Sequence, residues 1–265
     1  MTPPFLVVGA GPSGLGFATE IARQAPVVLL DRIPVTGGTA GWADARVRQF
    51  TAAAIRRRVQ LRLGESALRW GNGLLLVAAP RRFERIAGQH LIFAGGLRPA
   101  TAANLHITGD RPAGILAGTV AEHLLATGVK LWDNAVVLGD GPWARTVAER
   151  ARALGTRIVA VADSGNWGDE RLDRPDRLSV IGRDRVTHLR LHTSQSFIDV
   201  PCDAVVLAAD PKPNRNVDGA LVEGTPAVTF HQPVLPHAAA ERYEFAVQEA
   251  RKWLEANLEV NGEAK

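Results

Sequence analysis

The sequence predicts an α/β protein built around two parallel sheets, because the same local pattern occurs twice in its 265 residues. A short apolar run at 5–8 is followed by closely spaced glycines, a stretch of helical periodicity and a second apolar run at 27–30. The same order of features returns at 135–163. Strands that alternate with helices in this way pair in parallel. The repeat therefore predicts two domains of similar design.

The remaining segments are assigned from the periodicity of their apolar residues. Helical spacing is found in three stretches, namely 45–58, 116–126 and 238–257. Strand-like runs are found at 59–63, 74–78, 90–94, 178–181, 186–191, 196–200 and 204–208. The runs between 178 and 200 alternate polar and apolar residues, which is typical of an antiparallel meander. We expect the C-terminal helical stretch to pack on the first domain.

The composition fits a globular enzyme and excludes several other classes. With 46% hydrophobic and 22% charged residues the chain can bury a full core, so disorder is excluded as its main state. The single cysteine, Cys202, excludes a disulfide framework, a redox-active cysteine pair and cysteine-ligated metal or iron–sulfur sites. It favours a reducing, cytoplasmic compartment.

The charge and the hydropathy of the chain argue against nucleic-acid binding and against a membrane-spanning segment. The formal charge of +4 comes mostly from arginine, and no recognised nucleic-acid-binding fold pattern accompanies its short arginine clusters. We therefore expect no nucleic-acid partner. No uninterrupted apolar run approaches the roughly 18–20 residues of a membrane span, so no transmembrane segment is expected.

The motif Gly9-Ala10-Gly11-Pro12-Ser13-Gly14 follows the first strand-like run and opens the first helical stretch. Gly9 permits a tight turn, Gly11 lets the backbone approach a pyrophosphate, and Gly14 allows close packing of helix on strand. The helix N-terminus then favours an anion. Asp31 ends the second strand and is placed to accept hydrogen bonds from an adenosine ribose. Together these features predict a dinucleotide site.

A looser copy of the motif is found at Gly139-Asp140-Gly141-Pro142-Trp143-Ala144. Asp163 closes the following strand and would favour a free ribose 2′-hydroxyl, so NAD or another adenine nucleotide is expected there rather than NADP. The bulky Trp143 beside the turn could equally plug it. A nucleotide site and a purely structural domain both stay open for this copy.

Two such units resemble the two-dinucleotide-domain flavoproteins of the pyridine nucleotide-disulfide oxidoreductase group. Within that group the chain is most similar to FAD-dependent amino-acid dehydrogenase subunits of the hydrogen cyanide synthase, opine oxidase and hydroxyproline dehydrogenase type. The segments that carry the resemblance are 9–14, 30–32, 36–39, 91–98, 112–118, 139–144, 203–210 and 213–214. The fold implied is a pair of Rossmann-like three-layer (ββα) dinucleotide-binding domains, with the second inserted into the first.

The resemblance implies an FAD-binding domain formed by residues 1–110 and 200–265 and a second dinucleotide-binding domain at 111–199. It places the Gly37-Gly38 loop near the flavin and the turn at Ser66-Ala67 beside the adenine. The residues expected to hold a cofactor, from the motifs and the resemblance together, are Gly9, Gly11, Pro12, Ser13, Gly14, Asp31, Arg32, Gly38, Thr39, Ala67, Gly96, Gly139, Gly141 and Asp163.

The function implied is that of an FAD-dependent oxidoreductase, as one subunit of a heteromeric amine or amino-acid dehydrogenase or oxidase. Its expected partners are a small amine or amino-acid substrate and a second flavoprotein subunit. Two alternatives remain: a degenerate, non-catalytic nucleotide-binding or scaffolding subunit, and an NAD(P)H-dependent flavoprotein reductase. The redox cysteine pair of the disulfide reductases is absent, which excludes their chemistry.

No catalytic residue is assigned from the sequence, because a flavin itself accepts the hydride. The C-terminal glycine motif of the group is replaced by His231-Gln232, which we expect to direct a side chain toward the cofactor. His231 and His237 are candidate bases, since a neutral imidazole can take a substrate proton. The competing interpretation is that both are surface or loop histidines. No metal site is expected.

Overall fold

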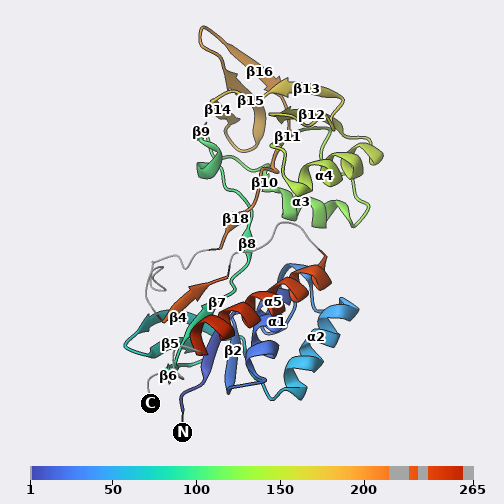
Figure 1. Ribbon diagram of the computed structural model, residues 1–265. Coiled ribbons are helices and arrows are strands. Elements are labelled where there is room, and N and C mark those ends of the chain that lie inside the picture. The colour runs from blue at the N-terminus through green and yellow to red at the C-terminus, as the bar shows by residue number, and fades with distance from the viewer. Residues whose placement is uncertain (1, 215–226, 232–237, 259–265) are drawn as a thin grey trace. The chain divides into compact units, whose positions relative to one another are not determined.

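The computed structural model describes residues 2–214, 227–231 and 238–258 and divides into two compact units (Figure 1). The first unit comprises Met1–Leu97 and Pro213–Lys265, and the second comprises Arg98–Lys212. The second unit is thus inserted into the first. The divisions lie at 97/98 and 212/213 rather than at the expected 110/111 and 199/200. The reason is that the strands at 107–109 and 204–207 both pair with strands of the second unit.

The first unit contains a five-stranded parallel sheet of order β19-β7-β1-β2-β3. Its strands are β1 (Phe5–Val8), β2 (Val27–Asp31), β3 (Gln60–Leu63), β7 (Leu91–Phe93) and β19 (Val228–Phe230). Its helices are α1 (Pro12–Ile21), α2 (Ala45–Arg56) and α5 (Ala239–Leu258), with a 3-10 turn η1 at Gly38–Ala40. An antiparallel meander is formed by β4 (Ser66–Gly71), β5 (Leu74–Ala79) and β6 (Arg82–Ala87).

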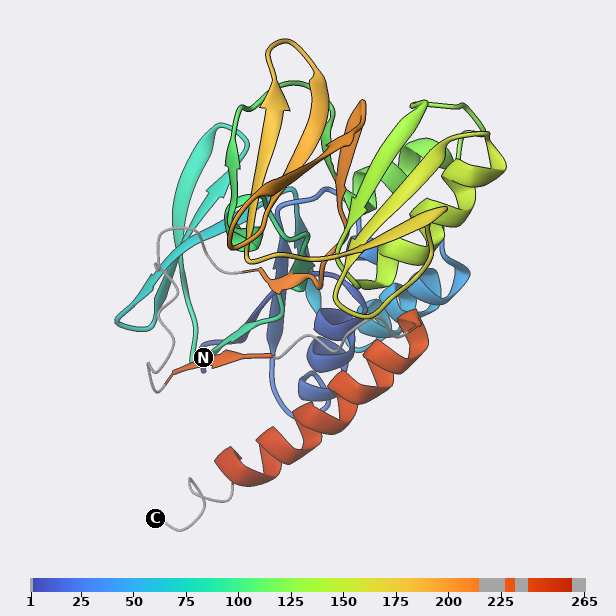
Figure 2. The same cartoon turned by 90° about the horizontal axis from the view of Figure 1, so that it is seen from above.

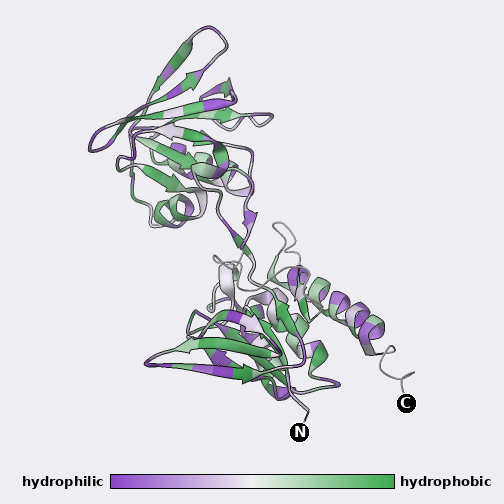
Figure 3. Ribbon diagram, turned by 90° about the vertical axis from the view of Figure 1, so that its left-hand side faces the viewer, coloured by the Kyte–Doolittle hydropathy of each residue, from purple (hydrophilic) through white to green (hydrophobic). Residues whose placement is uncertain are grey.

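Alternation along the strands builds a three-layer core in this unit, as predicted. Val7 and Leu29 face the helices and pack with Leu15 of α1, whereas Leu6 faces the other way and packs with Trp70 of the meander. Figure 3 shows that much of the strand ribbon is coloured as hydrophobic. The C-terminal α5 packs along α1, which confirms the docking expected from its periodicity (Figure 2).

The second unit repeats the design with a five-stranded parallel sheet of order β10-β17-β11-β12-β13. These strands are β10 (Ile115–Ala117), β11 (Asn134–Leu138), β12 (Arg157–Ala162), β13 (Glu170–Asp173) and β17 (Ala204–Leu207). The other elements are α3 (Gly118–Leu125), α4 (Pro142–Ala153), η2 (Ala103–Leu105), β9 (Ile107–Gly109), β14 (Arg177–Gly182), β15 (Val186–His192) and β16 (Phe197–Pro201). Short strands β8 (Leu97–Arg98) and β18 (Lys212–Pro213) pair where the chain enters and leaves the insertion.

The meander predicted at 178–200 is confirmed as β14, β15 and β16, and β9 joins it in parallel with β14. Its inner face packs on one face of the parallel sheet, with Leu178 and Leu189 against Val136, while α3 and α4 cover the other face. The strand at 204–208, which the resemblance assigns to the first domain, pairs with β10 and β11 instead. Within the described residues, no helix is long and apolar enough to cross a membrane.

Candidate dinucleotide sites

The first glycine turn has the strand–turn–helix geometry that the motif predicts. The amide of Gly9 donates to the carbonyl of Leu30 at 2.8 Å, and Gly9 has φ +109°, where a side chain would collide with the carbonyl of Ala94. A side chain at Gly14 would collide with the carbonyl of Gly9. Both glycines are therefore required by close packing of the protein's own backbone, as expected.

The second glycine of the motif, Gly11, faces open space instead. A Cβ built on Gly11 would meet only one atom within 4 Å among the described residues, the Cα of Gly38 at 3.9 Å. The converse Cβ on Gly38 would lie 3.3 Å from the Cα of Gly11. The amide of Gly37 donates to the carbonyl of Ala10 at 2.8 Å and holds the two turns together. We call this backbone-lined space between Gly11 and Gly38 the glycine cradle.

The helix that starts at the cradle presents its amides there. Gly11 is the N-cap of α1, and no side chain caps the helix there. Pro12, whose nitrogen carries no hydrogen, is the first residue of the helix and Ser13 is the second. The first amides of a helix have no partner within the helix and carry the positive end of its dipole. The arrangement therefore favours an anion at the cradle.

Asp31 lies at the end of β2, where the motif places it, and one of its oxygens holds the glycine turn. Its Oδ2 accepts a hydrogen bond from the amide of Ala10 at 2.6 Å, and its Oδ1 accepts from the amide of Ile33 at 2.8 Å. A carboxylate has about four acceptor positions. Asp31 can therefore still accept from a ribose hydroxyl. Arg32 follows it and is exposed.

The segment Ser66-Ala67, expected as a turn after β3, has a different conformation in the structure. Ser66 and Ala67 do not form a turn, because they begin β4 and pair with β5. The turn after β3 lies earlier, at Gly64 with φ +76°, where Glu65 donates its amide to the carbonyl of Asp31 at 2.9 Å. Ala67, in β4, is partly buried against the core between the sheet and the meander.

The glycine pair after β7 is held by Asn214, which follows β18. Asn214 donates its amide to the carbonyl of Gly96 at 2.8 Å and its side-chain Nδ2 to the carbonyl of Gly95 at 3.2 Å. Gly96 has φ +72°, and a Cβ there would meet no described atom within 4 Å. Thr39 lies beside Gly38 in η1 and its Oγ1 accepts from Nη1 of Arg242 at 3.0 Å. Sequence reasoning did not identify Arg242.

The second glycine turn starts in the same way but is closed by the protein's own backbone. Gly139 has φ +106° and donates to the carbonyl of Val161 at 2.9 Å, as Gly9 does in the first unit. The amide of Gly141, however, donates to the carbonyl of Ala208 at 2.8 Å. A Cβ on Gly141 would collide with that same carbonyl oxygen and lie 2.6 Å from the carbonyl carbon of Ala209. The glycine is needed here for packing, without any ligand.

Asp140 places a negative charge in the middle of this second turn. Its carboxylate accepts from the amides of Gly165 at 2.7 Å, Asp163 at 2.8 Å and Ser164 at 3.3 Å. Burial opposes ionisation, but these donors together hold the pKa of Asp140 below its usual value. The side chain of Asp163 is exposed beyond β12. Trp143 packs against the core that lies between the sheet and the helices of the second unit.

The candidate base His231 is buried rather than a surface histidine, and it lies in the irregular chain just beyond β19. It is 9% exposed and lies between two rings: Phe17 of α1, in an edge contact at 5.5 Å between centroids, and Phe245 of α5, in a tilted contact at 6.0 Å. Burial lowers its pKa, against the charge of Glu249, and its Nε2 has no hydrogen-bond partner among the described residues. The side chain is thus packed among α1 and α5 side chains. His237 lies outside the described residues.

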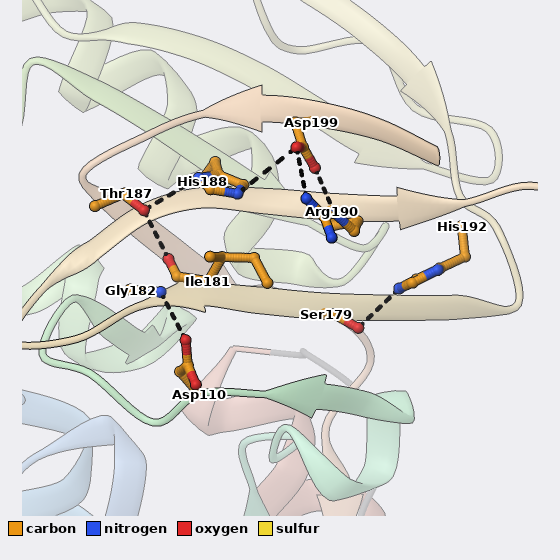
Figure 4. A network of polar contacts seen from close by, with 9 residues as sticks. All are labelled: Asp110, Ser179, Ile181, Gly182, Thr187, His188, Arg190, His192 and Asp199. Carbon is orange, nitrogen blue, oxygen red and sulfur yellow. Dashed lines mark hydrogen bonds and ion pairs between the residues drawn. The ribbon is translucent and has the colours of Figure 1, made fainter. Parts of the chain in front are cut away.

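A polar network on the outer face of the second unit's meander also escaped sequence analysis (Figure 4). Ser179 Oγ and His192 Nε2 are 2.8 Å apart, but Asp199 is bound by two guanidinium nitrogens of Arg190 at 2.7 and 2.9 Å. Arg190 holds the pKa of Asp199 below its usual value. Ser179 also bonds Thr108 Oγ1 at 2.8 Å. With the acid engaged by arginine, this set is a cross-strand network rather than a nucleophile and its base.

Comparison with known proteins finds partial similarity in sequence and near-complete similarity in fold. No protein-family model matches it. Sarcosine oxidase subunit alpha of Rhizobium meliloti (strain 1021) is 30% identical over 183 residues, covering 60% of this chain and 18% of that protein. The same subunit of Corynebacterium sp. (strain P-1) is 30% identical over 192 residues, covering 60% and 19%. The chain therefore spans about a fifth of the length of these relatives.

Solved structures match nearly the whole chain. Thioredoxin reductase of T. acidophilum superimposes with a TM-score of 0.67 at 15% identity over 96% of this chain and 98% of that one. L-proline dehydrogenase of P. horikoshii gives 0.65 at 16% identity, over 97% and 56%. A pyridine nucleotide-disulfide family oxidoreductase of Enterococcus faecalis V583 gives 0.66 at 15% identity, over 94% and 68%. The predicted fold is confirmed, because the chain shares the architecture of these structures over nearly its whole length, and part of it is similar in sequence to sarcosine oxidase alpha subunits.

Proposed function

We propose that the first unit binds FAD and that the chain is part of a heteromeric amine or amino-acid oxidoreductase. The observation that carries this proposal is the glycine cradle, where the N-terminus of α1 faces a space bounded by the backbone of Gly11 and Gly38. A diphosphate fits such a space, because unpaired amides and the helix dipole favour negative charge and no described side chain occupies it. Asp31 adds an acceptor for the ribose.

The residues of the first unit fit the role of a cofactor holder rather than of a nucleophile. When bound, FAD supplies the two-electron oxidation chemistry. The protein's part is to fix the dinucleotide with Gly9, Gly11, Pro12, Ser13 and Gly14. The remaining residues that we assign to this unit's site are Asp31, Arg32, Gly38, Thr39, Ala67 and Gly96.

The substrate class and the partner are inferred from the relatives. Two proteins with this fold or similar sequence are named for oxidation of sarcosine and proline, and both compounds are secondary amino acids. We therefore propose an amine or amino acid as substrate. The sequence relatives are named as alpha subunits, which supports assembly with another subunit, and we propose that this subunit is a second flavoprotein.

The closed second turn argues against a nicotinamide-linked reductase. The amide of Gly141 already donates to the carbonyl of Ala208, and the carboxylate of Asp140 would repel a phosphate brought into the turn. The lone cysteine, Cys202, is 5% exposed, and burial raises its pKa to about 12, so disulfide chemistry of the thioredoxin reductase kind has no nucleophile here. We propose that Gly139, Gly141 and Asp163 have a structural role.

The visible spectrum of the purified protein tests the proposal. We expect absorption bands near about 370 and 450 nm, which oxidised flavin gives. If FAD is lost in purification, adding it back to the protein should quench flavin fluorescence in a saturable titration. A colourless protein that binds no added FAD would contradict the proposal and leave the scaffolding subunit as the better interpretation.

A further inference from the structure

The start of α5 is held firmly beside the start of α1. A Cβ on Gly16 of α1 would lie 2.6 Å from the carbonyl oxygen of Tyr243, so the two backbones touch there. Tyr243 also stacks on Phe50 of α2, with ring centroids 4.0 Å apart and planes 11° apart. Further along, Arg251 of α5 pairs with Glu20 of α1 at 2.9 Å. The helices are therefore parallel, and their first turns lie at the same end of the packed pair.

Arg242 lies in the first turn of α5 with a hydrogen-bonding capacity that the described chain leaves partly unused. Its Nη1 donates to Thr39 Oγ1 at 3.0 Å, whereas its Nε is buried and has no hydrogen-bond partner among the described residues. Burial lowers its pKa, with the charge of Asp44 acting in the opposite direction. Asp44 already uses its Oδ1 to cap α2 through the amide of Arg46 at 2.7 Å.

A buried guanidinium nitrogen, such as this Nε, is unfavourable without a hydrogen-bond acceptor. Thr39, which Arg242 contacts, directly follows Gly38, and Gly38 forms one wall of the glycine cradle. The cradle favours an anion through helix amides alone. A nearby fixed cation would add charge-assisted hydrogen bonds, which are stronger than neutral ones.

We propose that Arg242 binds the diphosphate of the dinucleotide held at the glycine cradle, with Thr39 positioning its guanidinium. This inference rests on the proposed function, because it assumes a diphosphate ligand in the first unit. It assigns to α5 a direct binding role in addition to its packing on α1. It also gives the exposed Thr39 a specific role, which is to accept a hydrogen bond from Nη1 of Arg242 and so orient the guanidinium.

Titration of FAD and, separately, of ADP into the full-length protein freed of cofactor tests this role. We expect Arg242→Gln to raise the dissociation constants of both ligands by about 10- to 100-fold and Arg242→Lys to raise them less. Arg251→Gln is the matched control, since it removes the same charge from the same helix at its Glu20 contact. We expect that control to leave both constants within about twofold, since it makes no cradle contact.

The melting temperature of the cofactor-free variants separates binding from packing. Arg242→Gln should melt no lower than the wild type, because it removes a buried unpaired donor, whereas a merely structural arginine would lower it. Unchanged dissociation constants in Arg242→Gln, or an equal loss in Arg251→Gln, would overturn the assignment. If the wild type binds ADP in an Arg242-dependent way but not FAD, the FAD proposal fails and the Arg242 site stands. If it binds neither, both fail.

Discussion

The two glycine turns share a backbone geometry and differ in what faces the second glycine. In both units the first glycine has φ above +100° and donates to the strand that follows the helix. At Gly11 the Cβ direction is open except for Gly38, whereas at Gly141 it is filled by the backbone of Ala208 and Ala209, which follow β17. Glycine spacing therefore specifies the turn, and the neighbouring strand end decides whether a ligand has room.

The acidic residues of the two turns have exchanged roles. In the first unit Asp31, at the strand end, accepts from the amide of Ala10 within the turn. In the second unit Asp140, within the turn, accepts from amides 163–165 beyond the strand end. Both bridges join turn to strand end, but only the second puts a carboxylate where phosphates approach the helix. The two turns thus share one fold but differ in where the carboxylate lies.

Replacing the second glycine of the first turn should have the largest effect. Gly11→Val places its side chain in the cradle, and Gly11 has φ −72° and ψ 177°, an extended conformation that valine adopts readily. We expect FAD affinity to fall by more than about 1,000-fold, or roughly 4 kcal/mol, while stability changes by about 1 kcal/mol from the altered N-cap. Flavin fluorescence titration and urea unfolding measure the two effects. Retention of bound flavin by this variant would show that the cradle is not the site.

The matching change in the second turn should reverse that pattern. Gly141→Val drives a side chain into the backbone at Ala208 and Ala209, which must shift. We expect a loss of about 3 kcal/mol in the free energy of unfolding, with FAD affinity unchanged. Urea unfolding followed by tryptophan fluorescence reports the first and flavin titration the second. A stable Gly141→Val protein would mean that the second turn is as open as the first.

Much of this contrast could be predicted from the sequence, but its decisive parts could not. The motif at 9–14, the strand ends and the packing of the C-terminal helix follow from local periodicity and glycine sterics. The turn at Gly141 is closed by Ala208, which is distant in sequence. Arg242, which we propose binds the diphosphate at the glycine cradle, lies more than two hundred residues from Gly11. Such contacts arise only when the sheet order and the pairing of α1 with α5 are known.

The errors have the same origin. The sequence favours a surface or loop position for His231, because a polar residue after a strand is usually exposed. In the structure its backbone extends the ladder by donating to the carbonyl of Phe93 at 2.9 Å, and its ring enters the layer between Phe17 and Phe245. The turn expected at Ser66-Ala67 lies at Gly64 instead, because Ser66 is already the first residue of β4 and pairs with β5.

Acid should weaken the first unit before the second. His90 is half-buried, its Nε2 is 2.7 Å from Thr229 Oγ1, and burial lowers its pKa from 6.5 to about 4. Between those pH values the unfolded chain binds a proton that the folded chain does not, so stability falls as pH falls. Asp140, whose pKa is lowered in the folded second unit, loses its contribution only below its ordinary value of 3.8.

We therefore expect a loss of about 2 kcal/mol in the free energy of unfolding between pH 7 and pH 5 that depends on His90. His90→Gln, which keeps a hydrogen-bonding group near Thr229, should remove most of that pH dependence. Urea unfolding at the two pH values, with Asp140→Asn as the control in the second unit, measures it. An equal loss in His90→Gln would assign the acid sensitivity to other groups.

The reactivity of the thiol of Cys202 compares the two units in a different way. Cys202 is buried in the core shared by the parallel sheet and the meander, and burial, reinforced by the charge of Asp203, raises its pKa to about 12. Because only the thiolate attacks a disulfide reagent, the native thiol should react with dithionitrobenzoate at pH 8 at least about 100-fold more slowly than the urea-unfolded chain. The Gly11→Val protein should react equally slowly, and Gly141→Val faster, because local opening of its unit exposes the thiol. Fast reaction of the native wild type would show that the second unit is not closed, and the distinction between the two glycine turns would then have to be sought in dynamics rather than in packing.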